Sequence, residues 1–226
     1  MKNEILIKEI YTSLLSEFGH RHWWPADTAF EVIIGTILTQ NVSWRNVITA
    51  INNLKAEGLL NSEKLYRCDV DTIASLIKSS RFYNQKAKKI KRFMEFFYNK
   101  YNGNLQKMSR EETSFLRSEL LKINGFGEET VDSILLYACD KPIFVVDAYT
   151  KRIFSRFGII SEKARYGEVQ NFFMMVLPKK TELYNDFHAQ IVHLGNEICK
   201  TKPDCKICPI LKINNKIYCQ YGNKNE

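Results

Sequence analysis

The chain has 226 residues, of which 45% are hydrophobic and 26% are charged, with only 10 Gly and 5 Pro. This composition excludes global disorder and fibrous or low-complexity folds, and it allows one large globular domain or two modest ones. The formal net charge of +8, with a pI near 9.1, is compatible with a polyanionic partner such as nucleic acid and equally with an ordinary basic protein.

Helical periodicity dominates the chain from its first residues. Apolar residues from Ile5 to Phe18 recur at helix-face spacing and predict a helix over 3–18. Asp27 or Thr28 is expected to cap the second helix, and Ser109 with Glu112 has the spacing of a capping box. Further helices are predicted over 28–40, 43–56, 84–100, 112–122, 128–139, 148–157, 165–176 and 181–198.

Two glycines around one apolar residue interrupt the helices near the middle of the chain, at Gly125-Phe126-Gly127. Glycine tolerates positive φ, and free N–H groups at the start of a helix form an anion site. The pattern is typical of a helix-hairpin-helix, in which the N–H groups of Gly125 and Gly127 grip a DNA phosphate without reading sequence. An ordinary αα-hairpin, with a glycine only as a helix cap, remains the alternative.

An apolar run over 142–146 ends in Asp147, immediately before the helix predicted over 148–157. The run is either a short strand or an extended buried connection. A carboxylate at the start of a helix is either an N-cap or a catalytic acid, and for a single Asp the cap is the simpler interpretation. The residues alone leave both roles open.

Four of the six cysteines, Cys199, Cys205, Cys208 and Cys219, have five, two and ten residues between them. Four thiolates at such spacing indicate a metal centre, either tetrahedral zinc or a [4Fe–4S] cluster. One close pair with single cysteines on both sides favours the cluster. Lysines surround these ligands and could face phosphates: Lys200, Lys202, Lys206, Lys212 and Lys216. The remaining two, Cys68 and Cys139, are bystanders.

No apolar run reaches the roughly 18 residues of a membrane span, and the N-terminus shows no signal-peptide pattern. We therefore expect a cytoplasmic protein in a reducing compartment, associated with the nucleoid if the source is prokaryotic, and without a membrane partner.

Together these segments resemble the endonuclease III superfamily of DNA glycosylases. The resemblance extends from about Phe30 to Cys219 and rests on 38–41 (Leu-Thr-Gln-Asn), 82–87 (Phe-Tyr-Asn-Gln-Lys-Ala), 123–131, Asp147 and the four cysteines. It implies an all-α, two-domain fold with a C-terminal [4Fe–4S] loop. A helical bundle over 25–139 would end in the helix-hairpin-helix, and 1–24 plus 140–226 would form the cluster domain.

The recognition side resembles the 3-methyladenine DNA glycosylase III branch. That resemblance implies a pocket for a flipped base among Trp23, Trp24, Pro25 and Trp44. A cationic alkylated purine would be selected there by stacking and cation–π attraction. Core packing of the tryptophans is the alternative interpretation. The superfamily further implies that Gln40, with Asn41, fills the gap left by the base, and that Thr130 assists the hairpin.

The chain departs from its relatives at two points. Bifunctional members carry a Schiff-base lysine where this chain has Glu129, which predicts a monofunctional enzyme with weak or absent lyase activity. The last gap between cysteines is longer than in endonuclease III, and the branch that the pocket resembles does not typically carry a cluster.

The expected protein is a monomeric glycosylase of base excision repair. It would hydrolyse the N-glycosidic bond of an alkylated purine in double-stranded DNA, with Asp147 stabilising the sugar cation. Alternatives are a thymine/uracil mismatch or adenine glycosylase, a bifunctional endonuclease III-type enzyme, a non-catalytic damage sensor, and a zinc-bound nucleic-acid module. The basic run 86–92 could be a solvated helix face or a phosphate contact.

Overall fold

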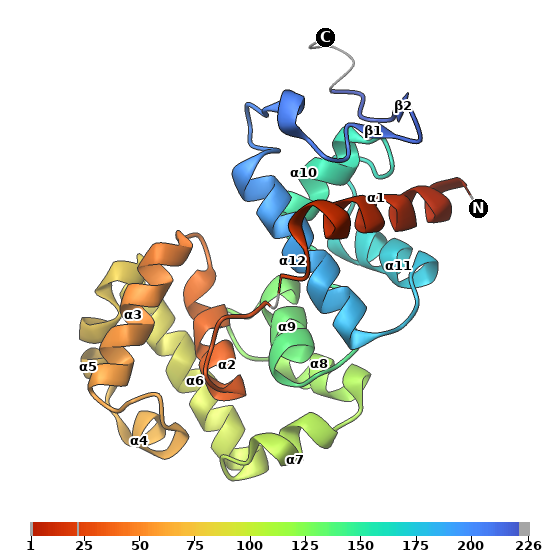
Figure 1. Ribbon diagram of the computed structural model, residues 1–226. Helices are drawn as coiled ribbons and strands as arrows, with labels where there is room; N and C mark the ends of the chain where they lie inside the picture. Colours follow the sequence, from red (N-terminus) through yellow and green to blue (C-terminus); the bar gives the residue numbers. More distant parts are fainter. Residues whose placement is uncertain (1, 22, 222–226) are drawn as a thin grey trace. The chain divides into compact units, whose positions relative to one another are not determined.

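The computed structural model describes residues 2–21 and 23–221, and helices account for most of them (Figure 1). Contacts divide the chain into two compact units, Trp24–Lys141 and the pair of segments Met1–Trp23 and Pro142–Glu226. The predicted all-α class is confirmed. In the part of the chain that the structure describes, no helix has both the length and the apolar character needed to cross a lipid bilayer.

The central unit, Trp24–Lys141, contains most of the helices. They are α2 (Ala29–Thr39), α3 (Trp44–Ala56), α4 (Ser62–Arg67), α5 (Val70–Leu76), η1 (Lys78–Ser80), α6 (Tyr83–Tyr101), α7 (Leu105–Arg110), α8 (Thr113–Leu121), α9 (Glu128–Ser133) and the π-helical turn η2 (Ile134–Ala138). The long periodic helices lie where the sequence predicts them. The short helices α4, α5 and α7 were missed because six or seven residues are too few to establish a period.

Helix caps in this unit correct one prediction. Thr28 caps α2 as expected, its hydroxyl accepting from Glu31 N at 3.1 Å. The predicted Ser109–Glu112 capping box is wrong, because Ser109 lies inside α7, which ends one residue later at Arg110. Glu112 is itself the N-cap of α8, and its carboxylate accepts from the main-chain N–H groups of residues 114 and 115 at 2.7 and 3.0 Å.

The second unit joins the N-terminal helix to the C-terminal part of the chain. Its elements are α1 (Lys2–Phe18), α10 (Ala148–Arg156), α11 (Tyr166–Val176), α12 (Thr181–Glu197), η3 (Cys205–Ile207), β1 (Lys212–Ile213) and β2 (Lys216–Ile217). Its core is aromatic: Phe144 stacks on Phe173 at 4.3 Å between ring centroids, and Phe154 and Phe187 meet them edge-on. These rings are fully buried, as expected for the largest apolar side chains.

The apolar run before Asp147 is an extended buried connection and pairs with no strand in the described residues. Side chains of α11 supply part of the hydrogen bonding that a sheet would provide. Gln170 donates to the Phe144 carbonyl at 2.7 Å, and the Tyr166 hydroxyl accepts from Val146 N at 3.3 Å. This satisfies buried main-chain groups and fixes the segment that delivers Asp147 to the start of α10.

Helices α10 and α12 lie side by side (Figure 1) and approach closely at Gly195. A Cβ added at Gly195 would lie 2.5 Å from the Tyr149 ring, so any larger residue would force the ring or the helix to shift. Arg152 secures the same contact by donating to the Gly195 carbonyl at 2.6 Å. The close packing brings residues of α12 next to the N-terminus of α10.

Candidate active site and cysteine loop

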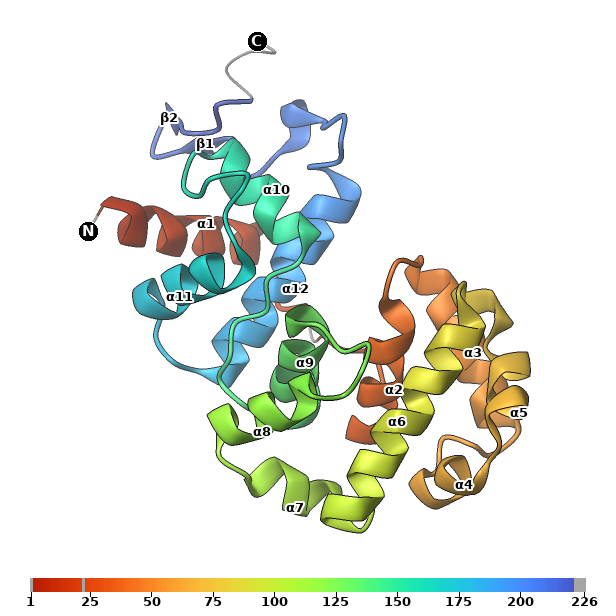
Figure 2. The same cartoon turned by 180° about the vertical axis from the view of Figure 1, so that it is seen from behind.

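The glycine hairpin joins α8 to α9 (Figure 2). Gly125 has φ of +95°, a value that L side chains rarely adopt, and Gly127 is the N-cap of α9. Phe126 points inward, as the sequence predicts: it is 7% exposed and stacks on Phe93 at 6.3 Å. The turn therefore presents its glycines on the surface while its apolar residue anchors it to the core.

A charged pair fastens the two helices of the hairpin to each other. Arg117 of α8 donates to both carboxylate oxygens of Asp132 in α9, at 2.7 and 3.0 Å, and to Glu128 at 3.3 Å. Asp132 is fully buried. The hydrogen bonds to Asp132 raise the pKa of Arg117 above its already high value, so the guanidinium stays charged.

Gln40 and Thr130, two of the predicted DNA contacts, meet in the structure. The Gln40 amide donates to the Thr130 hydroxyl at 2.8 Å, and Lys89 donates to the Gln40 side-chain carbonyl. The Lys89 chain also passes close to Gly125, where an added Cβ would meet its Cε at 2.7 Å. Asn41 is exposed, with a left-handed φ of +54°. Lys89 thus links the C-terminal end of α2 to the hairpin.

The basic run 86–92 does not form one solvated face, because its cations differ in burial and several bond main-chain carbonyls. Lys86 is 2% exposed and donates to the carbonyls of Leu38 and Ser80, and burial, with the charge of Lys89, lowers its pKa to about 8. Lys91 donates to two carbonyls at the C-terminal end of α4, those of Tyr66 and Cys68, and Arg92 donates to the Asn124 carbonyl. These cations mainly hold loops in place.

Trp24 and Trp44 lie together in the central unit, with ring centroids 5.2 Å apart and an edge-to-face angle of 81°. Tyr137 of the π-helical turn is the third member, 5.5 Å from Trp24. Tyr137 could not be predicted from the sequence, because nothing in the local pattern indicates a π-turn. Pro25 follows Trp24 directly in the chain and is exposed to solvent. Trp23 belongs to the other unit.

Asp147 is both the N-cap of α10 and a buried acid. Its Oδ1 accepts from Thr150 N at 2.6 Å and from the Thr150 hydroxyl at 2.7 Å, within a capping box. Its Oδ2 lies 3.6 Å from Nε2 of His188 on α12. Burial acts to raise the pKa of Asp147, but His188 and Thr150 outweigh it and hold the pKa below its ordinary value. The site therefore keeps an anionic carboxylate in a largely dehydrated setting.

All four predicted cysteine ligands line one pocket in the C-terminal loop, together with apolar side chains such as Leu194, Ile198 and Ile210. None of them is in a disulfide. Burial raises the pKa of the Cys208 thiol to about 12. Over residues 2–21 and 23–221, however, no three His, Cys, Asp or Glu side chains form a group that could hold a metal ion. The thiols share a cavity without converging on one point.

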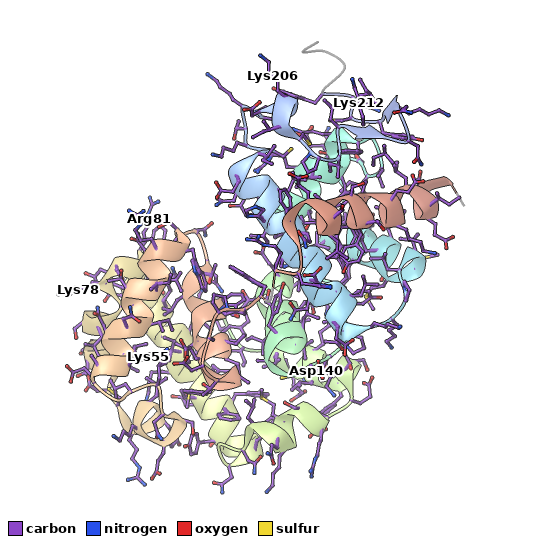
Figure 3. The ribbon with its side chains drawn as sticks, viewed as in Figure 1. Lys55, Lys78, Arg81, Asp140, Lys206 and Lys212 are labelled. Atoms are coloured by element: carbon purple, nitrogen blue, oxygen red, sulfur yellow. The ribbon has the colours of Figure 1, made fainter. Side chains whose placement is uncertain are left out.

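Two arginines of α10 hold this loop, which runs from residue 199 to 219. Arg156 donates to Cys199 Sγ at 3.1 Å and to the Lys200 carbonyl at 2.8 Å, and Arg152 donates to the Cys199 carbonyl at 2.8 Å. The ten-residue gap contains the β1–β2 hairpin, whose turn residues Asn214 and Asn215 both have positive φ. Lys206 and Lys212 extend from the loop into solvent (Figure 3).

Comparison with known proteins identifies the family. Residues 34–179 match the family described as HhH-GPD superfamily base excision DNA repair protein. The chain belongs to the HhH-GPD superfamily. The predicted resemblance to the endonuclease III superfamily is thereby confirmed, and the protein is a DNA glycosylase of a base excision repair superfamily, an enzyme class that acts on DNA.

A Methanocaldococcus jannaschii protein, provisionally named DNA repair glycosylase MJ1434, is 51% identical over 207 residues, covering 91% of this chain and 94% of the relative. The crystal structure of Helicobacter pylori 3-methyladenine DNA glycosylase (MagIII) bound to 1,N6-ethenoadenine is 29% identical, covers 86% of this chain and 96% of its own, and has a TM-score of 0.73.

A trapped endonuclease III–DNA covalent intermediate has a TM-score of 0.82 at 23% identity and covers 98% of both chains. At that identity the likeness concerns the fold, and it confirms the HhH-GPD fold for this chain.

Proposed function

We propose that this HhH-GPD protein is a monofunctional DNA glycosylase that hydrolyses the N-glycosidic bond of a damaged base flipped out of duplex DNA. The environment of Asp147 carries the proposal. A carboxylate kept anionic while buried can stabilise the positive charge that develops on the sugar as the bond breaks. Because Thr150 occupies Oδ1, the carboxylate has a fixed orientation, and Oδ2 is the oxygen that can face the sugar or a water.

The residue at the lyase position supports hydrolysis without strand cleavage. Glu129 lies exposed in the first turn of α9, next to Glu128. A carboxylate cannot form the Schiff base through which bifunctional superfamily members cleave the strand. Acidic residues in a first helical turn also have a structural reason, because they complement the helix dipole.

The aromatic group of Trp24, Trp44 and Tyr137 supports a flat, electron-poor base as substrate. Aromatic faces attract cationic rings, and an N-alkylated purine is cationic and already a good leaving group. Such a base needs stacking more than it needs a strong general acid. We therefore propose an alkylated purine similar to 3-methyladenine as the substrate, with Trp23 and Pro25 completing the pocket.

For the DNA backbone, we propose that the main-chain N–H groups of Gly125 and Gly127 bind a phosphate. Gln40, assisted by Asn41, would fill the space that the base leaves. The Gln40 amide now bonds Thr130, so insertion into DNA would exchange that hydrogen bond for contacts with a base. The partner would be double-stranded DNA bound by a monomer.

The residues of the cysteine loop fit a [4Fe–4S] cluster better than zinc. A tetrahedral zinc ion needs four sulfurs at about 2.3 Å from one point. The four thiols line one pocket, and a single close pair, Cys205 and Cys208, with one cysteine on either side is the arrangement that favours a cluster. Cys199, Cys205, Cys208 and Cys219 would hold the cluster. When bound, it would order the loop so that the loop's lysines present positive charge to phosphates, and catalysis would not pass through it.

Replacement of one carboxylate oxygen tests the catalytic assignment. Asp147→Asn keeps the shape of the side chain but removes its charge, so base release should be abolished while DNA binding remains. Glu162→Asn, at an exposed acid in the loop after α10, is a matched control and should leave base release unchanged. An Asp147→Asn protein that still excises bases would contradict the assignment.

A panel of duplexes tests the substrate. Duplexes would carry methylated purines, U:G, T:G, adenine opposite 8-oxoguanine, or thymine glycol, and released bases would be identified chromatographically. We expect release of 3-methyladenine without strand nicks and without a borohydride-trapped complex. Release of uracil or thymine alone would retain the glycosylase and overturn the alkylpurine proposal.

A further inference from the structure

His188 is a buried titratable group that the proposed mechanism does not yet use. It lies in the middle of α12, is 6% exposed, and is surrounded in sequence by core residues such as Phe187 and Ile191. Burial of an imidazole is unfavourable unless its nitrogens have partners. Its Nε2 lies 3.6 Å from Oδ2 of Asp147, and both side chains are at most 10% exposed.

The two oxygens of Asp147 are therefore held from different helices. Oδ1 accepts two hydrogen bonds from Thr150 of α10, at 2.6 and 2.7 Å. Oδ2 faces the imidazole of α12 at ion-pair distance. Thr150 alone would fix one oxygen and leave the carboxylate free to exchange a proton at the other. The histidine is placed where it opposes that protonation.

We infer that His188 is a positioning residue for the glycosylase reaction, which holds Asp147 anionic and orients its Oδ2 toward the sugar. This inference rests on the proposed role of Asp147. Either the imidazolium or the neutral tautomer with hydrogen on Nε2 can hold Asp147 in this way, because both direct an N–H donor at the carboxylate. It is not a catalytic residue, since it acts through Asp147.

The other charged or titratable groups around this segment have different partners. Lys151, which follows Thr150 on α10, donates to the Ala164 carbonyl at 3.0 Å. Tyr166, on α11, accepts from the main-chain N–H of Val146. His188 on α12 helps to hold the pKa of Asp147 below its ordinary value, and Thr150 of α10 contributes through uncharged hydrogen bonds.

Single-turnover kinetics with three variants tests the inference. The substrate is the panel duplex with the highest wild-type rate, and affinity is measured separately on a duplex carrying a tetrahydrofuran abasic-site analogue. His188→Met removes the N–H but keeps an apolar side chain of similar size. His188→Gln restores an N–H donor. His193→Met, on the same helix, changes a histidine whose ring packs against Phe18 instead.

We expect His188→Met to lower the rate of base release by about 10-fold to 100-fold, the range seen when a group that supports a functional side chain from behind is lost. Affinity for the abasic-analogue duplex should change by less than about 2-fold, a split that merely damaged packing would not produce. The acid limb of the pH–rate profile should move to higher pH, because the carboxylate loses a group that favours its charge. His188→Gln should recover most of the rate, and His193→Met should not lower it.

Comparison with Asp147→Asn separates the two proposals. If Asp147→Asn is inactive and His188→Met reduces the rate with a shifted acid limb, both proposals are supported. If Asp147→Asn is inactive but His188→Met is as fast as wild type, the inference is overturned and the proposed function stands. If Asp147→Asn is active, the catalytic assignment and the inference both fail. Equal losses in the Met and Gln variants with an unmoved acid limb would also overturn the inference.

Discussion

The glycine hairpin and the cysteine loop both carry proposed DNA or cofactor contacts on irregular backbone, but the chain stabilises them differently. The hairpin is held by its own side chains: Phe126 inserts into the core, and Arg117 joins Asp132 across α8 and α9. Each terminus of the hairpin continues into a helix. Its shape is therefore a consequence of ordinary core packing and one buried ion pair.

The cysteine loop has much less support from its own residues. Its regular structure consists of the three-residue turn η3 and strands of two residues each. Arg152 and Arg156 fasten its beginning, and the Gln220 N–H donates to the Arg156 carbonyl at its end. A loop with so little regular structure would gain order from the proposed cluster, as small metal-binding modules do from their metal. Packing thus orders the hairpin, and the proposed cluster would order the cysteine loop.

Loss of one cysteine should have the largest effect and should remain confined to the loop. Cys205→Ala removes a proposed ligand at the start of η3. We expect loss of the visible absorption band typical of iron–sulfur proteins, and hydrogen exchange across 199–219 that rises to the rate of an unstructured segment. The hairpin peptides 120–131 should keep their protection.

Cys68→Ala provides the matched control, since Cys68 is half-buried in the central unit and outside the four-cysteine set. It should leave both the absorption band and the loop protection unchanged. A Cys205→Ala protein that retained both would contradict the dependence of the loop on a ligand.

Loss of the hairpin ion pair should have an intermediate effect in the other region. Arg117→Met leaves the Asp132 carboxylate buried without its bidentate partner. Breaking a fully buried pair costs about 3–5 kcal/mol, and we expect about 2–3 kcal/mol here because Arg117 retains some solvent contact. Urea unfolding would measure the loss, and hydrogen exchange should increase at 120–131 but not at 199–219.

The exposed Arg110, in the last turn of α7, serves as the control for this change. Arg110→Met should alter the free energy of unfolding by at most about 0.5 kcal/mol, as is usual for surface positions. If the two variants were equally stable, the hairpin would not depend on its buried pair.

The sequence predicted those features that local patterns encode. The long helices followed from apolar periodicity, and the inward-facing Phe126 followed from its position between two glycines. Thr28 was recognised as a cap because a cap is a local hydrogen bond. The predicted Ser109–Glu112 capping box was wrong although its spacing is correct. Ser109 lies inside α7, and Glu112 caps the next helix, α8.

Features that depend on distant segments could not be predicted. His188 meets Asp147 only because Gly195 lets α12 approach α10, and neither residue carries a local sign of the other. Tyr137 joins Trp24 through a π-helical turn that has no sequence signature here. The basic run 86–92 looked like one surface, yet burial of Lys86 against the end of α2 is decided by packing within the central unit.

The close approach of α10 and α12 should give the smallest of the three effects. Gly195→Ala would place a methyl group 2.5 Å from the Tyr149 ring, which is destabilising. The higher helix propensity of alanine offsets roughly 1 kcal/mol of this cost. Overpacking of this kind costs about 1–3 kcal/mol, so we expect a net loss of stability of about 1 kcal/mol. Gly167→Ala in α11 meets no atom within 4 Å and should stabilise the protein instead.

Gly195→Ala should also slow base release, because Asp147 caps the start of α10, the helix that the added methyl group would displace. Opposite signs for the two alanines in thermal unfolding would support this; equal signs would show that α12 can shift to accommodate the methyl group.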